Sequence, residues 1–202
     1  MKKTLLLLFL IVSTKSVAQW NFSGGITLTD YNLKDTFTKD KLNNFQKTGT
    51  GFYAKISHTL YANKVIFVEP GFGFNTTNTE EKESFGIKSS NIILPVELGA
   101  KIGNHFKLVT GFQGNFLLTA KTIKNNQEIE FRSSHKNSYV DFLVGFDISA
   151  PRDKFHLTFR YNGSLKSVLE DRASSYDYLK GVYMIGLKYS LKPNKADTET
   201  TN

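Results

Sequence analysis

The sequence predicts an all-β chain that folds as an eight-stranded antiparallel up-and-down transmembrane β-barrel. Three observations support this prediction. The N-terminal segment has the pattern of an export signal, the rest of the 202-residue chain alternates apolar and polar residues, and long and short connections alternate along it. The chain also has 17 Phe, 9 Tyr and no cysteine. The aromatic content argues against a disordered chain, and the lack of cysteine excludes a disulfide framework and a thiolate zinc site.

Residues 1–18 are the first element, which we interpret as a cleaved signal peptide. A basic start precedes an apolar run over residues 4–12, and the small residues of Ser16-Val17-Ala18 follow. This order is typical of secretory signals, and we expect cleavage near Ala18. The alternative is a membrane-anchor helix, but a run this short does not cross a bilayer of about 30 Å. Because the mature chain leaves the cytoplasm, we expect no nucleic-acid partner, despite the formal charge of +8.

Eight runs of the mature chain have the period of two that is typical of strands with two unlike faces. Most are about ten residues or longer, which is the length that a tilted strand needs to cross a membrane. Strands of soluble proteins average roughly five to six residues. In chain order, the predicted strands are residues 20–29, 52–60, 66–74, 91–101, 106–118, 140–149, 155–162 and 179–191.

Each predicted strand has an apolar face and a polar face. In strand order, representative apolar positions are Phe22, Phe52, Phe72, Val96, Phe112, Val144, Phe159 and Leu187. Representative polar-face positions are Ser23, Lys55, Glu69, Glu97, Gln113, Asp147, Arg160 and Lys188. Since the apolar faces are large and almost free of charge, we expect them to meet lipid and the polar faces to line the lumen. A soluble lipid-binding barrel, with the faces reversed, is the alternative.

The connections predict the orientation of the barrel. Three are short, at residues 61–64, 103–104 and 151–153, and four are long, at residues 32–47, 75–86, 121–137 and 166–177. Strict alternation of short periplasmic turns and long extracellular loops is typical of outer-membrane barrels. An even number of strands then places both termini on the periplasmic side.

Three segments resemble the outer-membrane β-barrel domain of small "porin family" proteins. They are Gly51-Phe52-Tyr53-Ala54-Lys55 through Val68-Glu69-Pro70-Gly71-Phe72, then Asn91-Ile92-Ile93-Leu94-Pro95-Val96-Glu97-Leu98, and Phe159-Arg160-Tyr161-Asn162-Gly163. The resemblance implies a Gram-negative outer-membrane location and a barrel over residues 19–191, but it implies little about activity. Barrels of this kind usually end on an aromatic residue that the assembly machinery recognises. Here a polar tail, residues 192–202, follows the last strand, and we expect it in the periplasm.

The predicted lumen contains a set of charged residues that we expect to form an ion-pair network. Buried charge is costly unless it is paired. Glycines on the same face, such as Gly73, Gly111 and Gly145, indicate space made inside a narrow lumen. The predicted network consists of Lys55, Glu69, Glu97, Lys107, Asp141, Asp147, Arg160 and Lys188. It either plugs the barrel and fixes strand register, or lines a narrow gated path for ions or small solutes.

The sequence offers no convincing catalytic or cofactor site. The four histidines, His58, His105, His135 and His156, do not have the spacing of metal ligands, and no phosphate-binding loop or nucleophile elbow is present. We therefore predict a non-enzymatic envelope or surface-binding protein without cofactor. Its expected partners are outer-membrane lipids, the barrel assembly machinery and an extracellular ligand at the long loops. The alternatives are a narrow channel and a lipid-modifying barrel enzyme.

A closed membrane barrel predicts a specific behaviour on detergent gels. We expect the unheated chain to migrate differently from the boiled chain, because a barrel with every strand paired resists the detergent until it is heated. Gel electrophoresis of membrane fractions with and without boiling measures this. Recovery of the chain in soluble form, without detergent, would contradict the prediction.

Overall fold

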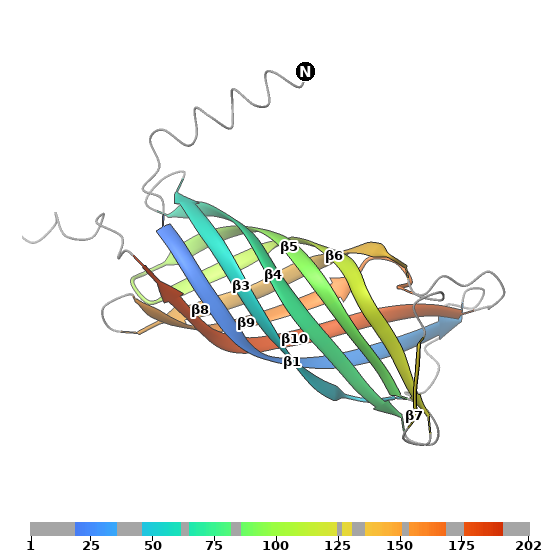
Figure 1. The fold of residues 1–202 in the computed structure, drawn as a ribbon. Helices are drawn as coiled ribbons and strands as arrows, with labels where there is room; N and C mark the ends of the chain where they lie inside the picture. Colours follow the sequence, from blue (N-terminus) through green and yellow to red (C-terminus); the bar gives the residue numbers. More distant parts are fainter. Residues whose placement is uncertain are drawn as a thin grey trace, which may run out of the picture.

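Among the residues it describes, the computed structural model has eight long strands and two short ones (Figure 1). It describes residues 19–35, 46–61, 65–81, 86–124, 127–130, 136–150, 154–168 and 176–191. The strands are β1 (Gln19–Asp35), β2 (Gln46–Lys47), β3 (Gly49–Tyr61), β4 (Ile66–Glu81), β5 (Gly86–Ile102), β6 (Phe106–Lys124), β7 (Gln127–Glu130), β8 (Ser138–Ser149), β9 (Phe155–Ser164) and β10 (Tyr176–Ser190).

The eight long strands pair antiparallel and close into a barrel, as predicted. β1 lies between β3 and β10, so the first and last strands of the chain are neighbours. The path continues through β9, β8, β6 and β5, and the pairing of β5 with β4 and of β4 with β3 completes the circuit. Closure gives each of the eight long strands two long neighbours, which is the condition for backbone that crosses hydrocarbon.

The two faces of the strands have the predicted orientation. On the outside, Phe52, Phe72 and Phe112 expose 56%, 58% and 59% of their surface. Their polar neighbours along the chain, such as Lys55 and Gln113, are buried inside the barrel. The exterior is therefore apolar and the interior polar, which is the arrangement of a barrel with lipid as its outer solvent.

The short connections β3–β4, β5–β6 and β8–β9 lie at one end of the barrel, which we call the turn end, and the opposite end is the loop end. At the turn end, Gly103 has a φ of 61°, a left-handed conformation that glycine adopts without strain. Outward aromatic rings meet near this end. Trp20 stacks on His58 with ring centroids 4.6 Å apart, and Phe155 and Tyr189 are 5.0 Å apart. Such rings suit the boundary between lipid and water.

The strands at the loop end are longer than predicted, so the predicted long loops are wrong in extent, most clearly in two cases. Residues 75–86 are mostly strand, because β4 continues to Glu81 and β5 begins at Gly86. Residues 121–137 include the end of β6 and the short strand β7. The sequence here is polar on both faces and rich in threonine, which favours strands. Without an apolar face, the period of two could not be recognised.

Several predictions concern segments outside the described residues. These include the signal peptide at residues 1–18, the tail at residues 192–202 and the loop residue His135. Among the described residues, no helix is long and apolar enough to cross a membrane.

The exposed apolar surface predicts how the barrel responds to a charge on its outside. Phe112 lies near the middle of the part of β6 that pairs with β8, so Phe112→Arg should lower the free energy of unfolding by about 2–4 kcal/mol. Phe155→Arg, at the turn end, is the matched control and should cost roughly 0–1 kcal/mol. Denaturant unfolding in phospholipid vesicles measures both. Equal costs at the two positions would contradict a lipid-facing surface.

Candidate functional site

Six charged side chains form a closed ring in the lumen, alternating between positive and negative. Each comes from a different strand: β3, β5, β9, β8, β10 and β4. We call this set the lumen ring. Its members, in order around the ring, are Lys55, Glu97, Arg160, Asp147, Lys188 and Glu69.

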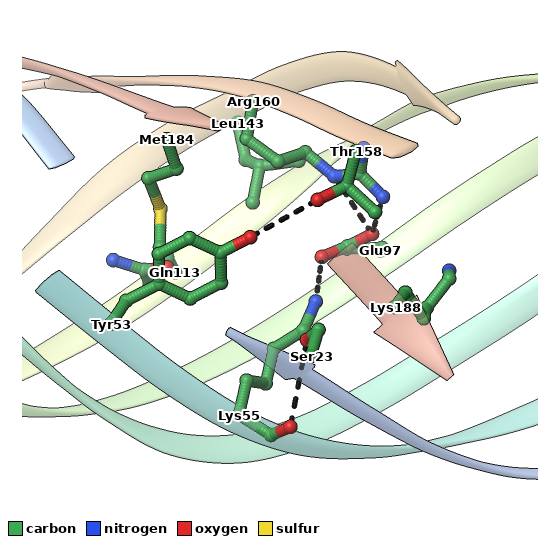
Figure 2. Close-up of a pocket in the computed structure, with 10 residues that line it drawn as sticks. All are labelled: Ser23, Tyr53, Lys55, Glu97, Gln113, Leu143, Thr158, Arg160, Met184 and Lys188. Atoms are coloured by element: carbon green, nitrogen blue, oxygen red, sulfur yellow. Dashed lines mark hydrogen bonds and ion pairs between the residues drawn. The ribbon is translucent and has the colours of Figure 1, made fainter. Parts of the chain in front are cut away.

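Glu97 and Arg160 form the best-connected part of the ring. The guanidinium of Arg160 donates to Glu97 Oε2 from Nε at 3.2 Å and from Nη2 at 2.9 Å. The Lys55 ammonium reaches the other oxygen of Glu97 at 2.5 Å, and Figure 2 shows both cations pointing at this carboxylate. Arg160 Nη1 lies 2.7 Å from Asp147 Oδ1. Arg160 therefore links two carboxylates that lie on opposite sides of it.

Lys188 and Glu69 complete the circuit. The Lys188 ammonium lies 2.6 Å from Asp147 Oδ2 and 3.2 Å from Glu69 Oε2. Lys55 lies 4.0 Å from Glu69 Oε1, which closes the ring. Ser57 and Thr59 donate hydroxyl hydrogen bonds of 2.6 and 2.8 Å to the two Glu69 oxygens. Each charge thus has partners of opposite sign, as charge in a buried site requires.

The register explains why the ring alternates. Glu69 and Glu97 lie directly opposite each other on β4 and β5, and like charges in that position repel. Lys55 contacts both carboxylates, so it offsets the repulsion. The three acids and three bases balance, and all six side chains are buried. The ring is therefore neutral as a unit.

Glycine makes room for the long side chains of the ring. Lys55 pairs with Gly73 across β3 and β4, and Arg160 pairs with Gly145 across β8 and β9. A Cβ at Gly145 would come within 2.8 Å of Arg160 Cδ, and a Cβ at Gly73 within 3.1 Å of Lys55 Cβ. Both distances are closer than atoms normally pack. The glycines on the polar face thus form the space in which the ring lies.

A group of apolar side chains, which we call the apolar layer, lies beside the ring on the side of the loop end, together with the buried amides of Gln113 and Asn162. Tyr53, Ile93, Val182 and Met184 form a buried cluster, and Leu143 is also buried beside it. The Tyr53 hydroxyl is hydrogen-bonded to the Thr158 hydroxyl at 3.0 Å. Apart from the Met184 thioether, this hydroxyl is the one polar group on the side chains of the cluster, and it has a partner. Figure 2 shows Tyr53, Leu143 and Met184 near Lys55, Glu97 and Arg160.

The space left between the ring and the apolar layer is small. A cavity bounded by Ser23, Lys55, Gln113, Thr158 and others has about 10 Å³ of free volume. Roughly 10–15 Å³ is the minimum that holds one water molecule. Side chains therefore fill this section of the lumen almost completely.

Two of the eight predicted network residues lie outside the ring. Asp141 lies nearer the loop end, where its Oδ2 accepts a hydrogen bond of 2.9 Å from Asn115. Lys107 lies toward the turn end, opposite Asp147 in the register of β6 and β8, with its ammonium 6.0 Å from the centroid of the Phe67 ring. The other six residues, Lys55, Glu69, Glu97, Asp147, Arg160 and Lys188, are the ring itself.

Sequence reasoning missed a chain of hydrogen bonds between the turn end and the ring. His156 contacts the Ser149 hydroxyl at 2.8 Å through Nδ1 and the Ser190 hydroxyl at 3.2 Å through Nε2. Ser190 donates to Asn21 Oδ1, and Asn21 donates to Thr59, which in turn donates to Glu69. All of these residues lie on the predicted polar faces, so the alternation of inward and outward positions along each strand placed them in the lumen. Their contacts depend on the stagger between neighbouring strands, and the alternation does not predict that stagger.

A closed antiparallel barrel with an apolar exterior and a charged interior defines the class of outer-membrane β-barrels. The chain belongs to the family described as "Outer membrane protein beta-barrel domain", which matches residues 13–170. The protein is therefore an outer-membrane barrel, in agreement with the resemblance noted in the sequence. Comparison with curated proteins found no significant match.

Solved structures of outer-membrane barrels share the fold. Ail, the attachment invasion locus protein of Yersinia pestis, is 17% identical with a TM-score of 0.50, over 86% of this chain and 98% of that chain. Neisserial surface protein A is 10% identical with a TM-score of 0.53, over 85% of this chain and 97% of that chain. The same Yersinia protein in complex with the heparin analogue sucrose octasulfate is 18% identical with a TM-score of 0.49, over 86% and 98% of the two chains. At these identities the likeness concerns the fold alone.

The lumen ring predicts a large effect when one of its charges is removed. Arg160→Ala leaves Glu97 and Asp147 buried with one partner fewer, so it should lower the free energy of unfolding by about 3–5 kcal/mol. Lys154→Ala, at an exposed position of the turn end, is the control and should have little effect. Thermal or denaturant unfolding in vesicles measures both. An unchanged melting temperature for Arg160→Ala would contradict a structural role for the ring.

Proposed function

We propose that the protein is a plugged, non-enzymatic barrel that acts in the envelope through its loop end and does not conduct ions. The proposal includes removal of residues 1–18 near Ala18 and a periplasmic position for residues 192–202. The order of a basic start, an apolar run and small residues before Gln19, and the polar composition of residues 192–202, support these boundaries. Outer-membrane lipids and the barrel assembly machinery are the partners that such a chain requires.

The observation that carries the proposal is that two layers of side chains, the lumen ring and the apolar layer, lie across the lumen. An ion that enters from the loop end passes Asp141 and then reaches the apolar layer, whose side chains do not compensate the loss of its water. It then meets six charges that already compensate one another, and about 10 Å³ of free space. Eight strands enclose an interior that side chains alone are able to fill. These features support a plug rather than a path.

The contacts of His156 favour a structural rather than a catalytic role. An imidazole between two serine hydroxyls resembles the contact of a nucleophile with its base. Here, however, His156 is 1% exposed, and its Ser190 partner is engaged with Asn21. A substrate could not reach Ser149 without opening the packed lumen, so we assign this group to the stability of the turn end.

The loop end supports a role in surface contacts. β4, β5 and β6 continue beyond the last pairing of β6 with β8, which is Phe116 with Ser138. β2 pairs with β4, and β7 pairs with β6, so the extended strands continue as a paired sheet past the barrel wall at the loop end, at the lower right of Figure 1. A paired sheet presents a more defined surface than separate loops, and such a surface suits the binding of an extracellular ligand.

Conductance of the purified barrel tests the plug. In planar bilayers, the wild-type protein should give no current above that of a protein-free membrane. The double variant Arg160→Ala/Met184→Ala removes one side chain from the ring and one from the apolar layer, and it should give measurable single-channel currents. Leu187→Ala, on the outside, is the control and should remain silent. A steady wild-type current that scales with voltage would show that the lumen is a narrow channel and would overturn the proposal.

A further inference from the structure

The pairing of β4 with both of its neighbours is interrupted in one short stretch of the barrel wall. All three strands are described there, yet Glu69 and Pro70 have no partner in the register with β3, and Gly71 and Phe72 have none in the register with β5. The other ladders between long strands run without such a gap over the described residues, apart from a register shift beside Asn91 on β5. We call this stretch of β4 the seam.

Two prolines explain the interruption. Proline has no backbone N–H and therefore removes a hydrogen bond from a ladder. Pro70 keeps its register partner on β5, and Pro95 of β5 keeps its partner on β6, so each gap lies on the other side of the proline. Inside a sheet, proline is confined mainly to edges and bulges, and an unpaired backbone group in hydrocarbon is costly. The seam is therefore a locally weakened part of the wall.

Side chains in the lumen join the strands where the backbone does not. Ser57 and Thr59 of β3 donate hydroxyl hydrogen bonds of 2.6 and 2.8 Å to the Glu69 carboxylate. Lys55, also on β3, contacts both Glu69 and Glu97, so it spans β4 and β5. Hydrogen bonds and ion pairs to a charged group are stronger than those between neutral groups. The seam is thus held from inside the barrel, with Glu69 as the shared acceptor.

The two sides of the seam differ in what they face. On the outside, Phe72 of β4 and Leu94 of β5 expose 58% and 41% of their surface to lipid. On the inside, Pro95 lies midway along β5 between Glu97 of the lumen ring and Ile93 of the apolar layer. An opening of the seam would therefore lead from the hydrocarbon of the bilayer to the level between the ring and the apolar layer, and not to water at either end.

We propose that the barrel wall opens laterally at the seam, with Glu69 as the latch that keeps it shut. In the open state β4 separates from β5 for a few residues, while the paired positions on either side hold the strands in register. The opening gives small apolar molecules dissolved in the membrane a sideways route to the lumen, and it gives ions none, because they enter from water. The inference goes beyond the proposed function and holds whether or not the lumen conducts.

Relaxation-dispersion NMR of the folded barrel in phospholipid nanodiscs tests the opening, because it detects exchange on the microsecond to millisecond timescale. In the wild type, the amides of Gly71 and Phe72 should show exchange several-fold larger than the amide of Phe112 on β6, where pairing is continuous. Pro70→Ala/Pro95→Ala supplies both missing N–H donors, so it should lower exchange at the seam to the level of β6.

The latch is tested by Glu69→Gln, which should increase exchange at the seam several-fold, since the neutral side chain loses its charge-assisted contacts. Asp141→Asn is the matched control, because it makes the same change at a buried lumen carboxylate outside the latch, and it should leave the seam as in the wild type. Thr59→Val removes one hydrogen bond to Glu69 and gives a second reading if Glu69→Gln does not fold.

Three results would overturn the proposal. The first is a wild type in which Gly71 and Phe72 show no more exchange than β6. The second is exchange that persists unchanged in the alanine double variant, because the prolines would then not be its cause. The third is an equal increase in Glu69→Gln and Asp141→Asn, because the lumen as a whole would then loosen and Glu69 would not be a latch.

Discussion

The need to pair every backbone amide within hydrocarbon determines the rest of this structure. A sheet that crosses a membrane has no solvent to satisfy an open edge, so the first and last strands must meet. Here β1 pairs with β10 along almost its whole length. Closure at eight strands makes the lumen too narrow for a column of water and too wide to leave empty. The inward side chains must therefore fill it, and polar ones must find partners within it.

The lumen ring meets this requirement with charge, and the apolar layer meets it with packing. A ring in which cations and anions alternate needs no water, because each carboxylate lies between two cations. Lys55 contacts both members of the like-charged pair Glu69 and Glu97, and Arg160 joins Glu97 to Asp147. Glycine opposite Lys55 and Arg160 leaves the space for their side chains. Strand register, glycine position and charge order are thus parts of one arrangement.

Much of the fold could be predicted from the sequence, because alternating apolar and polar residues indicate a strand with lipid on one face and a polar lumen on the other. The position of Lys55 or Arg160 in the alternating pattern of its strand is enough to place its side chain in the lumen. The extension of β4 and β5 beyond the membrane could not be predicted, because residues such as Thr77 and Asn78 are polar on both faces. The order of the ring was also out of reach. Lys188 meets Glu69 across 119 positions of sequence, and only the stagger of the closed barrel brings them together.

The ring has a further consequence for how the chain assembles. Lys55, Glu69 and Glu97 come from the N-terminal half and carry one excess negative charge, whereas Asp147, Arg160 and Lys188 come from the C-terminal half and carry one excess positive charge. Neither half is neutral until the other is in place. The two halves therefore attract each other across the unfinished sheet, and a half-formed barrel has uncompensated charge that disfavours its entry into lipid. We expect these six side chains to couple closure of the barrel to its insertion.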